Sequence, residues 1–242
     1  KYEAWYLSKG NSANGLSVNL RTIRALYNRA IKQKLISSEY YPFGDYTIKS
    51  ETTRKRAILT KDLELIKQYE PRTERQARAK DYFLLSFYLM GASFVDIAML
   101  KVKNIIGGRI EYKRRKTGRL HSIPLSTPLQ AILDKYLPGK EKEDFILNIV
   151  KTTDLQKQGV KIHDELRRFN RALKEIGIAC GIEAQLTSYV ARHSYATIAK
   201  YKGVPTAVIS EALGHSSEEV TQVYLDSFDK EVMDKYHNMI IE

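Results

Sequence analysis

The stretch that decides the fold is YVARHSYATIAKYKG at residues 189–203, followed by ALGHSS at 212–217 and VTQVY at 220–224. The first segment has the apolar spacing and the final glycine of a helix. Pro205 lies where a second helix can begin, and Gly214 lies where it can end. The end of the chain is therefore expected to be a series of short helices joined by tight turns.

The remainder of the chain has helical periodicity with one insert that is rich in strands. At 102–125, glycine pairs interrupt apolar residues that alternate with charged ones, which is typical of strands joined by turns. Thr60 is expected to begin one helix, and Gly91 to end another in a left-handed conformation. The predicted helices before the final third span residues 16–36, 61–69, 74–90, 127–137 and 163–181.

These elements predict a mainly α protein with a small antiparallel β-hairpin, in the α+β class. The first predicted helix places Leu20, Ile23 and Leu26 on one stripe. Residues 37–56 are rich in charge and turn formers and have no helical period, which indicates a linker. We therefore expect two domains, at 1–51 and 52–242.

The composition indicates a polyanionic partner. The 242 residues include 40 Lys and Arg against 28 Asp and Glu, which gives a net charge of +12. A basic surface without such a partner is the alternative.

The single cysteine, Cys180, excludes an internal disulfide and fits a reducing cytosol. No apolar run is long enough to span a membrane and no signal peptide is recognisable, so a cytoplasmic protein is expected. Because the sequence opens at Lys1 without a methionine, we expect a fragment of a longer protein.

The ordered combination in the final third resembles the tyrosine recombinase (phage integrase) family. That family has an Arg-His pair inside a helix, a Leu-Gly-His turn and a tyrosine shortly downstream; here Tyr224 follows His215 by 224 − 215 = 9 residues. GRIEYKRRKTGRLHSIPL at 108–125 resembles the family's β-hairpin, whose turn carries a catalytic lysine. The resemblance covers roughly residues 55–230, and the first helix fits the tail of the family's DNA-clamping core-binding domain.

The resemblance implies a role for each matching residue. Tyr224 is expected to be the nucleophile that becomes bonded to DNA phosphate. Arg192 is expected to bind the charge that develops on the phosphate oxygens, because a guanidinium donates two hydrogen bonds and loses no proton. Lys116, in the hairpin turn, is expected to protonate the leaving 5′ oxygen. His215 is expected to donate to a phosphate oxygen or to assist the tyrosine.

The chain departs from the family's pattern at two positions. Ser93 occupies the place of the family's first arginine, as in a subgroup from bacterial mobile elements, and a serine carries no charge. Tyr189 occupies a place that is commonly histidine, and its hydroxyl can still donate to phosphate. Asp96 occupies an acidic place that would orient a catalytic group. Because residues two apart in a strand share a face, Arg114 is expected on the same side as Lys116, where it could supply the missing cation.

The remaining histidines are not expected to act. His193 matches a structural position of the family, and neither His121 nor His163 has supporting context. The sequence shows no metal-binding cluster and no phosphate-binding glycine loop, and tyrosine-based transfer needs no cofactor.

The leading hypothesis is a site-specific DNA recombinase or integrase that cuts and rejoins strands through a 3′-phosphotyrosine and mobilises a genetic element. It would act on double-stranded DNA at a core recombination site, as a tetramer, with accessory DNA-bending proteins as further partners. The tetramer would use a C-terminal helix at 229–241, with Val232, Tyr236 and Ile240 at helical spacing, docked on a neighbour or packed on its own domain. Two alternatives stay open: a DNA-binding module of the same fold that has lost catalysis, and a type IB topoisomerase-like activity.

Overall fold

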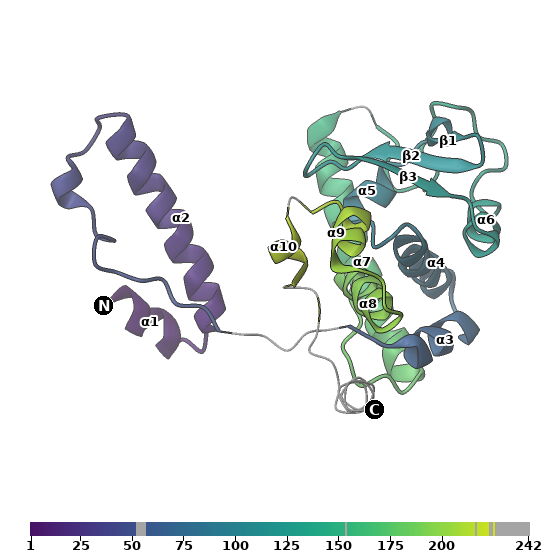
Figure 1. Ribbon diagram of the computed structural model, residues 1–242, viewed down its shortest axis with the longest axis horizontal. Coiled ribbons are helices and arrows are strands. Elements are labelled where there is room, and N and C mark those ends of the chain that lie inside the picture. The colour runs from purple at the N-terminus through teal and green to yellow at the C-terminus, as the bar shows by residue number, and fades with distance from the viewer. Residues whose placement is uncertain (52–56, 153, 216, 223–224, 226–242) are drawn as a thin grey trace, which may run out of the picture. The chain divides into compact units, whose positions relative to one another are not determined.

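The protein is described by a computed structural model. The described residues are 1–51, 57–152, 154–215, 217–222 and 225. The chain divides into two compact units, residues 1–54 and residues 55–242, and each is described here by itself (Figure 1).

The first unit is a helical hairpin. A short helix α1 (Tyr2–Ser8) packs against the longer α2 (Ala13–Lys32), and a 3₁₀ turn η1 (Ser38–Tyr40) follows. The hydroxyl of Ser12 accepts the N–H of Gly15 and so caps α2. The sequence predicted only one helix here, because the seven residues of α1 are too few to show a helical period.

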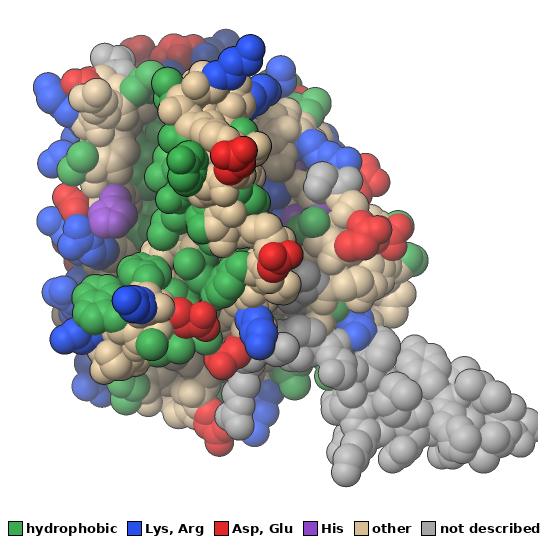
Figure 2. Space-filling model, turned by 90° about the vertical axis from the view of Figure 1, so that its left-hand side faces the viewer, with side chains coloured by type: hydrophobic (Ala, Val, Ile, Leu, Met, Phe, Trp, Pro, Cys, Tyr) green, Lys and Arg blue, Asp and Glu red, His purple; other side chains and the backbone are tan. Residues whose placement is uncertain are grey.

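The apolar stripe expected on α2 is only partly buried in this unit. Leu16 and Phe43 are buried, and the ring of Tyr27 meets Phe43 edge-on at 6.2 Å. Leu26, expected on the same stripe, is 62% exposed. Figure 2 shows a face of the molecule on which hydrophobic side chains lie exposed among Lys and Arg.

The second unit contains helices around a main core, a second and smaller buried cluster, and a small sheet at one end (Figure 1). The helices are α3 (Thr60–Gln68), α4 (Glu74–Tyr88), α5 (Phe94–Ala98), α6 (Thr127–Leu133), α7 (Leu155–Ala179), α8 (Ser188–Tyr201), α9 (Thr206–Leu213) and α10 (Glu218–Gln222). The expected mainly α fold with a small antiparallel sheet is confirmed. In the described part of the chain, no helix is both long and apolar enough to cross a membrane.

Helix α4 lies at the centre of the second unit. It packs against α6, α7 and α8, and its side chains Phe83 and Leu85 are completely buried. The hydroxyl of Thr73 caps its first turn by accepting the N–H of Gln76. The apolar half of α4 is surrounded by neighbours, which explains why its sequence becomes apolar on all faces.

The sheet is formed by the stretch that the sequence predicted. Strands β1 (Ile105–Ile106), β2 (Arg109–Lys113) and β3 (Leu120–Pro124) pair antiparallel in the order β1-β2-β3. Along β2 the side chains of Ile110 and Tyr112 point into the core. A 3₁₀ turn η2 (Val102–Asn104) precedes the sheet.

Thr60 begins α3, as the sequence predicted, and the capping position before it is Leu59, whose side chain makes no capping bond. Two other local features differ from the expectation. Helix α7 starts at Leu155 and not near His163, because the carboxylate of Asp154 accepts the N–H groups of two residues in its first turn. The short α5 was not expected, and it is nucleated by a cap from Ser93.

Gly91 closes the turn that follows α4, in the left-handed conformation that the sequence predicted, with φ of +74°. Its N–H donates to the carbonyl of Ser86 at 2.9 Å. A Cβ at this position would lie 3.0 Å from the Cα of Arg192. Gly203, after α8, has a similar φ of +77° but no atom within 4 Å of such a Cβ.

We predict that Gly91→Ala destabilises the protein more than Gly203→Ala. Both variants put an alanine in the left-handed region, at a cost of about 1–2 kcal/mol, but only the first also displaces α8. Thermal unfolding of the two variants measures the difference. Equal losses of stability would show that the close approach of Gly91 to Arg192 carries no energy.

Candidate active site

The site is built around the turn that follows α9. Gly214 has a left-handed backbone with φ of +64°, which ends the helix as the sequence predicted. The carbonyl oxygens of Leu213 and Gly214 are left without helical partners at this end, and both accept hydrogen bonds from arginine side chains. The turn therefore gathers cations that come from distant parts of the sequence.

Arg192, from α8, is buried with 3% of its surface exposed. Its Nη1 donates to the carbonyl of Gly91 at 2.8 Å, and its Nη2 donates to the carbonyl of Leu213. The same Nη2 lies 2.8 Å from Nε2 of His215. These contacts fix the guanidinium between the end of α4 and the end of α9.

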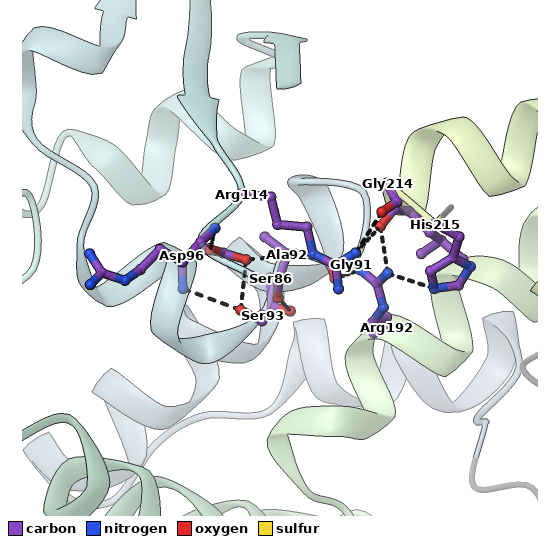
Figure 3. A network of polar contacts seen from close by, with 11 residues as sticks. Ser86, Gly91, Ala92, Ser93, Asp96, Arg114, Arg192, Gly214 and His215 are labelled. Atoms are coloured by element: carbon purple, nitrogen blue, oxygen red, sulfur yellow. Dashed lines mark hydrogen bonds and ion pairs between the residues drawn. The ribbon is translucent and has the colours of Figure 1, made fainter. Parts of the chain in front are cut away.

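Arg114, directly after β2, reaches the same turn. It is 8% exposed, and its Nη1 donates to the carbonyls of Leu213 at 2.8 Å and Gly214 at 2.9 Å. Figure 3 shows Arg114 and Arg192 extending from different elements toward the turn at Gly214. The two guanidinium groups share the carbonyl oxygen of Leu213 as an acceptor.

Two buried cations side by side repel each other and need counter-charge. Asp96 supplies a negative charge to Arg114, with its Oδ2 at 3.9 Å from Nε of that residue. Asp96 is itself buried, and its Oδ1 accepts the backbone N–H of Arg115 at 3.0 Å. Two buried guanidinium groups that meet at one turn make a site suited to an anion.

Ser93 contacts Asp96. Its hydroxyl donates to Oδ2 of Asp96 at 2.7 Å and caps α5 by accepting the N–H of the same residue. Ser93 therefore orients the carboxylate that faces Arg114, as Figure 3 shows. The cation at this side of the site comes from Arg114.

The strand alternation used to place Arg114 holds only in part. Ile110, Tyr112 and Arg114 alternate inward as expected, but Lys116 and Arg115 are both exposed. The chain turns after Arg114, whose carbonyl accepts the N–H of Gly118 at 2.8 Å. The turn ends the two-residue period after Arg114, so the strand argument does not extend to Lys116.

His215 is buried against Arg192, and its Nδ1 lies 2.8 Å from the hydroxyl of Thr221. Burial, together with the charges of Arg192 and Arg114, lowers the pKa of His215 to about 4. The imidazole is therefore neutral near pH 7. Lys116 also lowers this pKa, which places its ammonium within electrostatic reach of the site.

The two tyrosines among the candidate site residues, Tyr189 and Tyr224, have different outcomes. Tyr189 is 53% exposed, and its ring meets that of His193 at 4.9 Å. Tyr224, the expected nucleophile, lies outside the described residues, as does the predicted C-terminal helix at 229–241. Leu225, beside Tyr224 in the sequence, is buried in a small cluster with Leu213 and Ile209.

The sequence patterns missed two residues at this site, Thr221 and His121. The ring of His121 stacks on Tyr112, its cross-strand neighbour, at 5.2 Å, and its buried Nε2 has no hydrogen-bond partner among the described residues. A Cβ on Gly214 would lie 2.6 Å from that nitrogen, so the imidazole packs directly on the turn. Burial, followed by the charge of Arg114, lowers the pKa of His121. The inward register of β3 was a signal that could have identified it.

The arrangement suits chemistry at a phosphodiester. Preorganised guanidinium groups in a buried site stabilise charge that develops on phosphate oxygens, and they need no reorganisation at the moment of reaction. A neutral imidazole beside them can accept or pass on a proton. Among the residues that the structure describes, no group of three His, Cys, Asp or Glu side chains could hold a metal ion.

We predict that stability falls as the pH decreases from 6.5, the ordinary pKa of histidine, toward 4, the pKa of buried His215. In this range the unfolded chain binds a proton that the folded protein does not, so protonation favours unfolding. His215→Gln removes this contribution and should show a shallower loss. Unfolding in urea between pH 6.5 and 4 measures it, with His163→Gln, at an exposed position, as the control. A wild-type slope in His215→Gln would contradict the assignment.

Comparisons with known proteins show the family of the chain. Residues 57–231 match the model of the phage integrase family, and residues 1–49 match that of the phage integrase SAM-like domain. A tyrosine recombinase of Pseudothermotoga lettingae is 26% identical over 192 residues, which cover 76% of this chain and 61% of that protein. Tyrosine recombinase XerD of Staphylococcus haemolyticus is 24% identical, over 96% of this chain and 78% of its own.

Solved structures share the fold. A lambda integrase dimer bound to a COC′ core site superposes with a TM-score of 0.69 at 18% identity, covering 94% of this chain and 79% of that one. The XerH recombinase bound to difH in a pre-cleavage complex gives a TM-score of 0.63 at 19% identity, covering 92% and 65%. With the family model matching most of its length, the chain belongs to the phage integrase family.

Proposed function

We propose that this chain is the catalytic part of a tyrosine-type site-specific DNA recombinase. The observation that carries the proposal is the convergence of Arg114, Arg192 and His215 on the turn at Leu213–Gly214. The spacing from His215 to Tyr224 in the sequence adds the nucleophile. The names of the relatives, tyrosine recombinases among them, support the same activity.

The reaction follows from these side chains. The phenolic oxygen of Tyr224 gives its proton to the neutral imidazole of His215 and attacks the scissile phosphorus, so a P–O bond to tyrosine forms and the P–O bond to the 5′ oxygen breaks. Lys116 gives its proton to that leaving oxygen. Arg192 and Arg114 neutralise the charge on the nonbridging oxygens. A 5′ hydroxyl from another strand reverses the step, which rejoins DNA without an external energy source.

Arg114 replaces the arginine that Ser93 does not supply. Its guanidinium lies against the same carbonyl as that of Arg192, so both groups can reach one phosphate. The carboxylate of Asp96 pairs with Nε of Arg114 and so orients its guanidinium. The hydroxyl of Ser93 in turn orients that carboxylate. Ser93 therefore carries no charge itself and acts on Arg114 only through Asp96.

The wider assignments rest on the same family. The first unit would be the C-terminal part of the DNA-clamping core-binding domain, with the catalytic domain from residue 52, and the partner of the protein would be double-stranded DNA. Recombination would take place in a tetramer, as in the lambda integrase tetramer solved on a Holliday junction. The protein would integrate or excise a mobile element in the bacterial cytoplasm at the nucleoid, with DNA-bending proteins as accessory partners.

Two other functions are separable by experiment. A binding module without catalysis would bind DNA but form no covalent product, and Ser93 and Tyr189 are the residues that favour it. A type IB topoisomerase would relax supercoils without sequence preference, whereas a recombinase requires a defined core site. The buried arginine pair favours catalysis, because simple DNA binding is served by exposed cations.

We predict that Tyr224→Phe abolishes covalent attachment to DNA and leaves DNA affinity unchanged, because only the attacking oxygen is removed. Incubation with a nicked core-site substrate, followed by SDS electrophoresis, measures the adduct. Tyr201→Phe, at another tyrosine of the same unit, is the control. An adduct formed by Tyr224→Phe would show that another residue is the nucleophile.

We predict that Arg114→Ala lowers the cleavage rate at saturating DNA by about a hundredfold or more, the effect of removing a preorganised donor from a developing anion. Arg115→Ala, its exposed neighbour, should lose affinity alone. Single-turnover cleavage and DNA titration separate the two effects.

An arginine introduced at position 93 provides a second test of the role of Arg114. Ser93→Arg in the Arg114→Ala background should recover part of the rate if both positions serve one electrostatic role. Loss of affinity in Arg114→Ala with an unchanged rate would instead assign this arginine to a flanking phosphate.

A further inference from the structure

Thr221 lies in α10 and makes a buried contact with the candidate active site. Its side chain is completely buried, and its hydroxyl oxygen is 2.8 Å from Nδ1 of His215. In the sequence it precedes Tyr224 by 224 − 221 = 3 residues. The contact therefore joins His215 to the helix that leads toward the expected nucleophile.

The neighbours of His215 determine which ring nitrogen carries the proton. A guanidinium N–H can only donate, so Nε2 of His215 must accept from Nη2 of Arg192, at 2.8 Å. In the neutral ring the proton is then on Nδ1, and it is donated to the hydroxyl oxygen of Thr221. The lone pair of Nε2 is consequently turned toward Arg192.

The contacts form one continuous chain through the interior. Thr221 accepts from His215, His215 accepts from Arg192, and Arg192 donates to the carbonyl of Gly91. The side chains of Thr221, His215 and Arg192 are 0%, 5% and 3% exposed. Hydrogen bonds are stronger in such surroundings, where water does not compete for the donors and acceptors.

We propose that Thr221 is a positioning residue that fixes the ring orientation and tautomer of His215. This inference rests on the proposed recombinase activity for its functional consequence, but the tautomer itself is a property of the DNA-free protein. When a phosphate oxygen takes over the N–H of Arg192, the lone pair of Nε2 in a ring held in this way can accept the phenolic proton of Tyr224. Without the hydroxyl of Thr221, the ring can turn or adopt the other tautomer, in which Nε2 carries the proton and repels the arginine.

A pair of substitutions separates this role from simple packing. Thr221→Val keeps the shape of the side chain and removes the hydroxyl, whereas Thr221→Ser keeps the hydroxyl and removes a methyl group. The first measurement is the ¹⁵N spectrum of the His215 ring in the DNA-free protein. We expect a single tautomer with protonated Nδ1 in the wild type and in Thr221→Ser, and loss of that tautomer in Thr221→Val.

The second measurement is the rate of adduct formation on the nicked core-site substrate at saturating DNA. We expect Thr221→Val to react about tenfold more slowly, as for other residues that orient a functional imidazole. Its DNA affinity should be unchanged, and its circular dichroism spectrum should show that it is folded. Thr221→Ser should retain most of the wild-type rate. A Thr221→Val protein with the wild-type tautomer and rate would overturn the proposal.

The two readouts also separate this inference from the proposed function. If the wild type forms no adduct, the recombinase assignment fails, and the ring spectrum still decides whether Thr221 fixes the tautomer. If the wild type forms an adduct and Thr221→Ser is as impaired as Thr221→Val, the side chain acts through packing and the positioning role is wrong.

Discussion

The carbonyl oxygen of Leu213 is the acceptor on which the candidate active site depends. It receives hydrogen bonds from Arg114, after β2, and from Arg192, within α8. A helix end leaves such a carbonyl unpaired, and the left-handed Gly214 turns the chain so that side chains can reach it. One backbone atom thereby brings together cations that are 192 − 114 = 78 residues apart in the sequence.

This arrangement has a consequence for binding. In the DNA-free protein the backbone carbonyls of Gly91, Leu213 and Gly214 accept the arginine N–H groups that a phosphate would use. The guanidinium groups are therefore already desolvated and oriented, and a phosphate exchanges one acceptor for a better, charged one. His215 stays neutral beside them, since its pKa is lowered to about 4 by burial and by the same arginines.

The sequence predicted those features that depend on local patterns. The left-handed glycines at 91 and 214 follow from helix-end chemistry, and the inward position of Arg114 follows from the two-residue period of β2. The start of α7 and the cap of α5 depend on single side chains whose alternatives look equally good in one sequence. The contacts of His121 and Thr221 were missed because they join residues from separate elements, and no period in the sequence records such a contact.

The central claim is that Arg114 neutralises the scissile phosphate together with Arg192. A substrate in which a neutral methylphosphonate replaces one phosphate tests it most directly, because it removes the charge that the arginine is meant to meet. The account predicts that Arg114→Ala regains cleavage when the methylphosphonate is at the scissile position and not when it is at a flanking position. Recovery only with the flanking substitution, or no recovery with either, would contradict it.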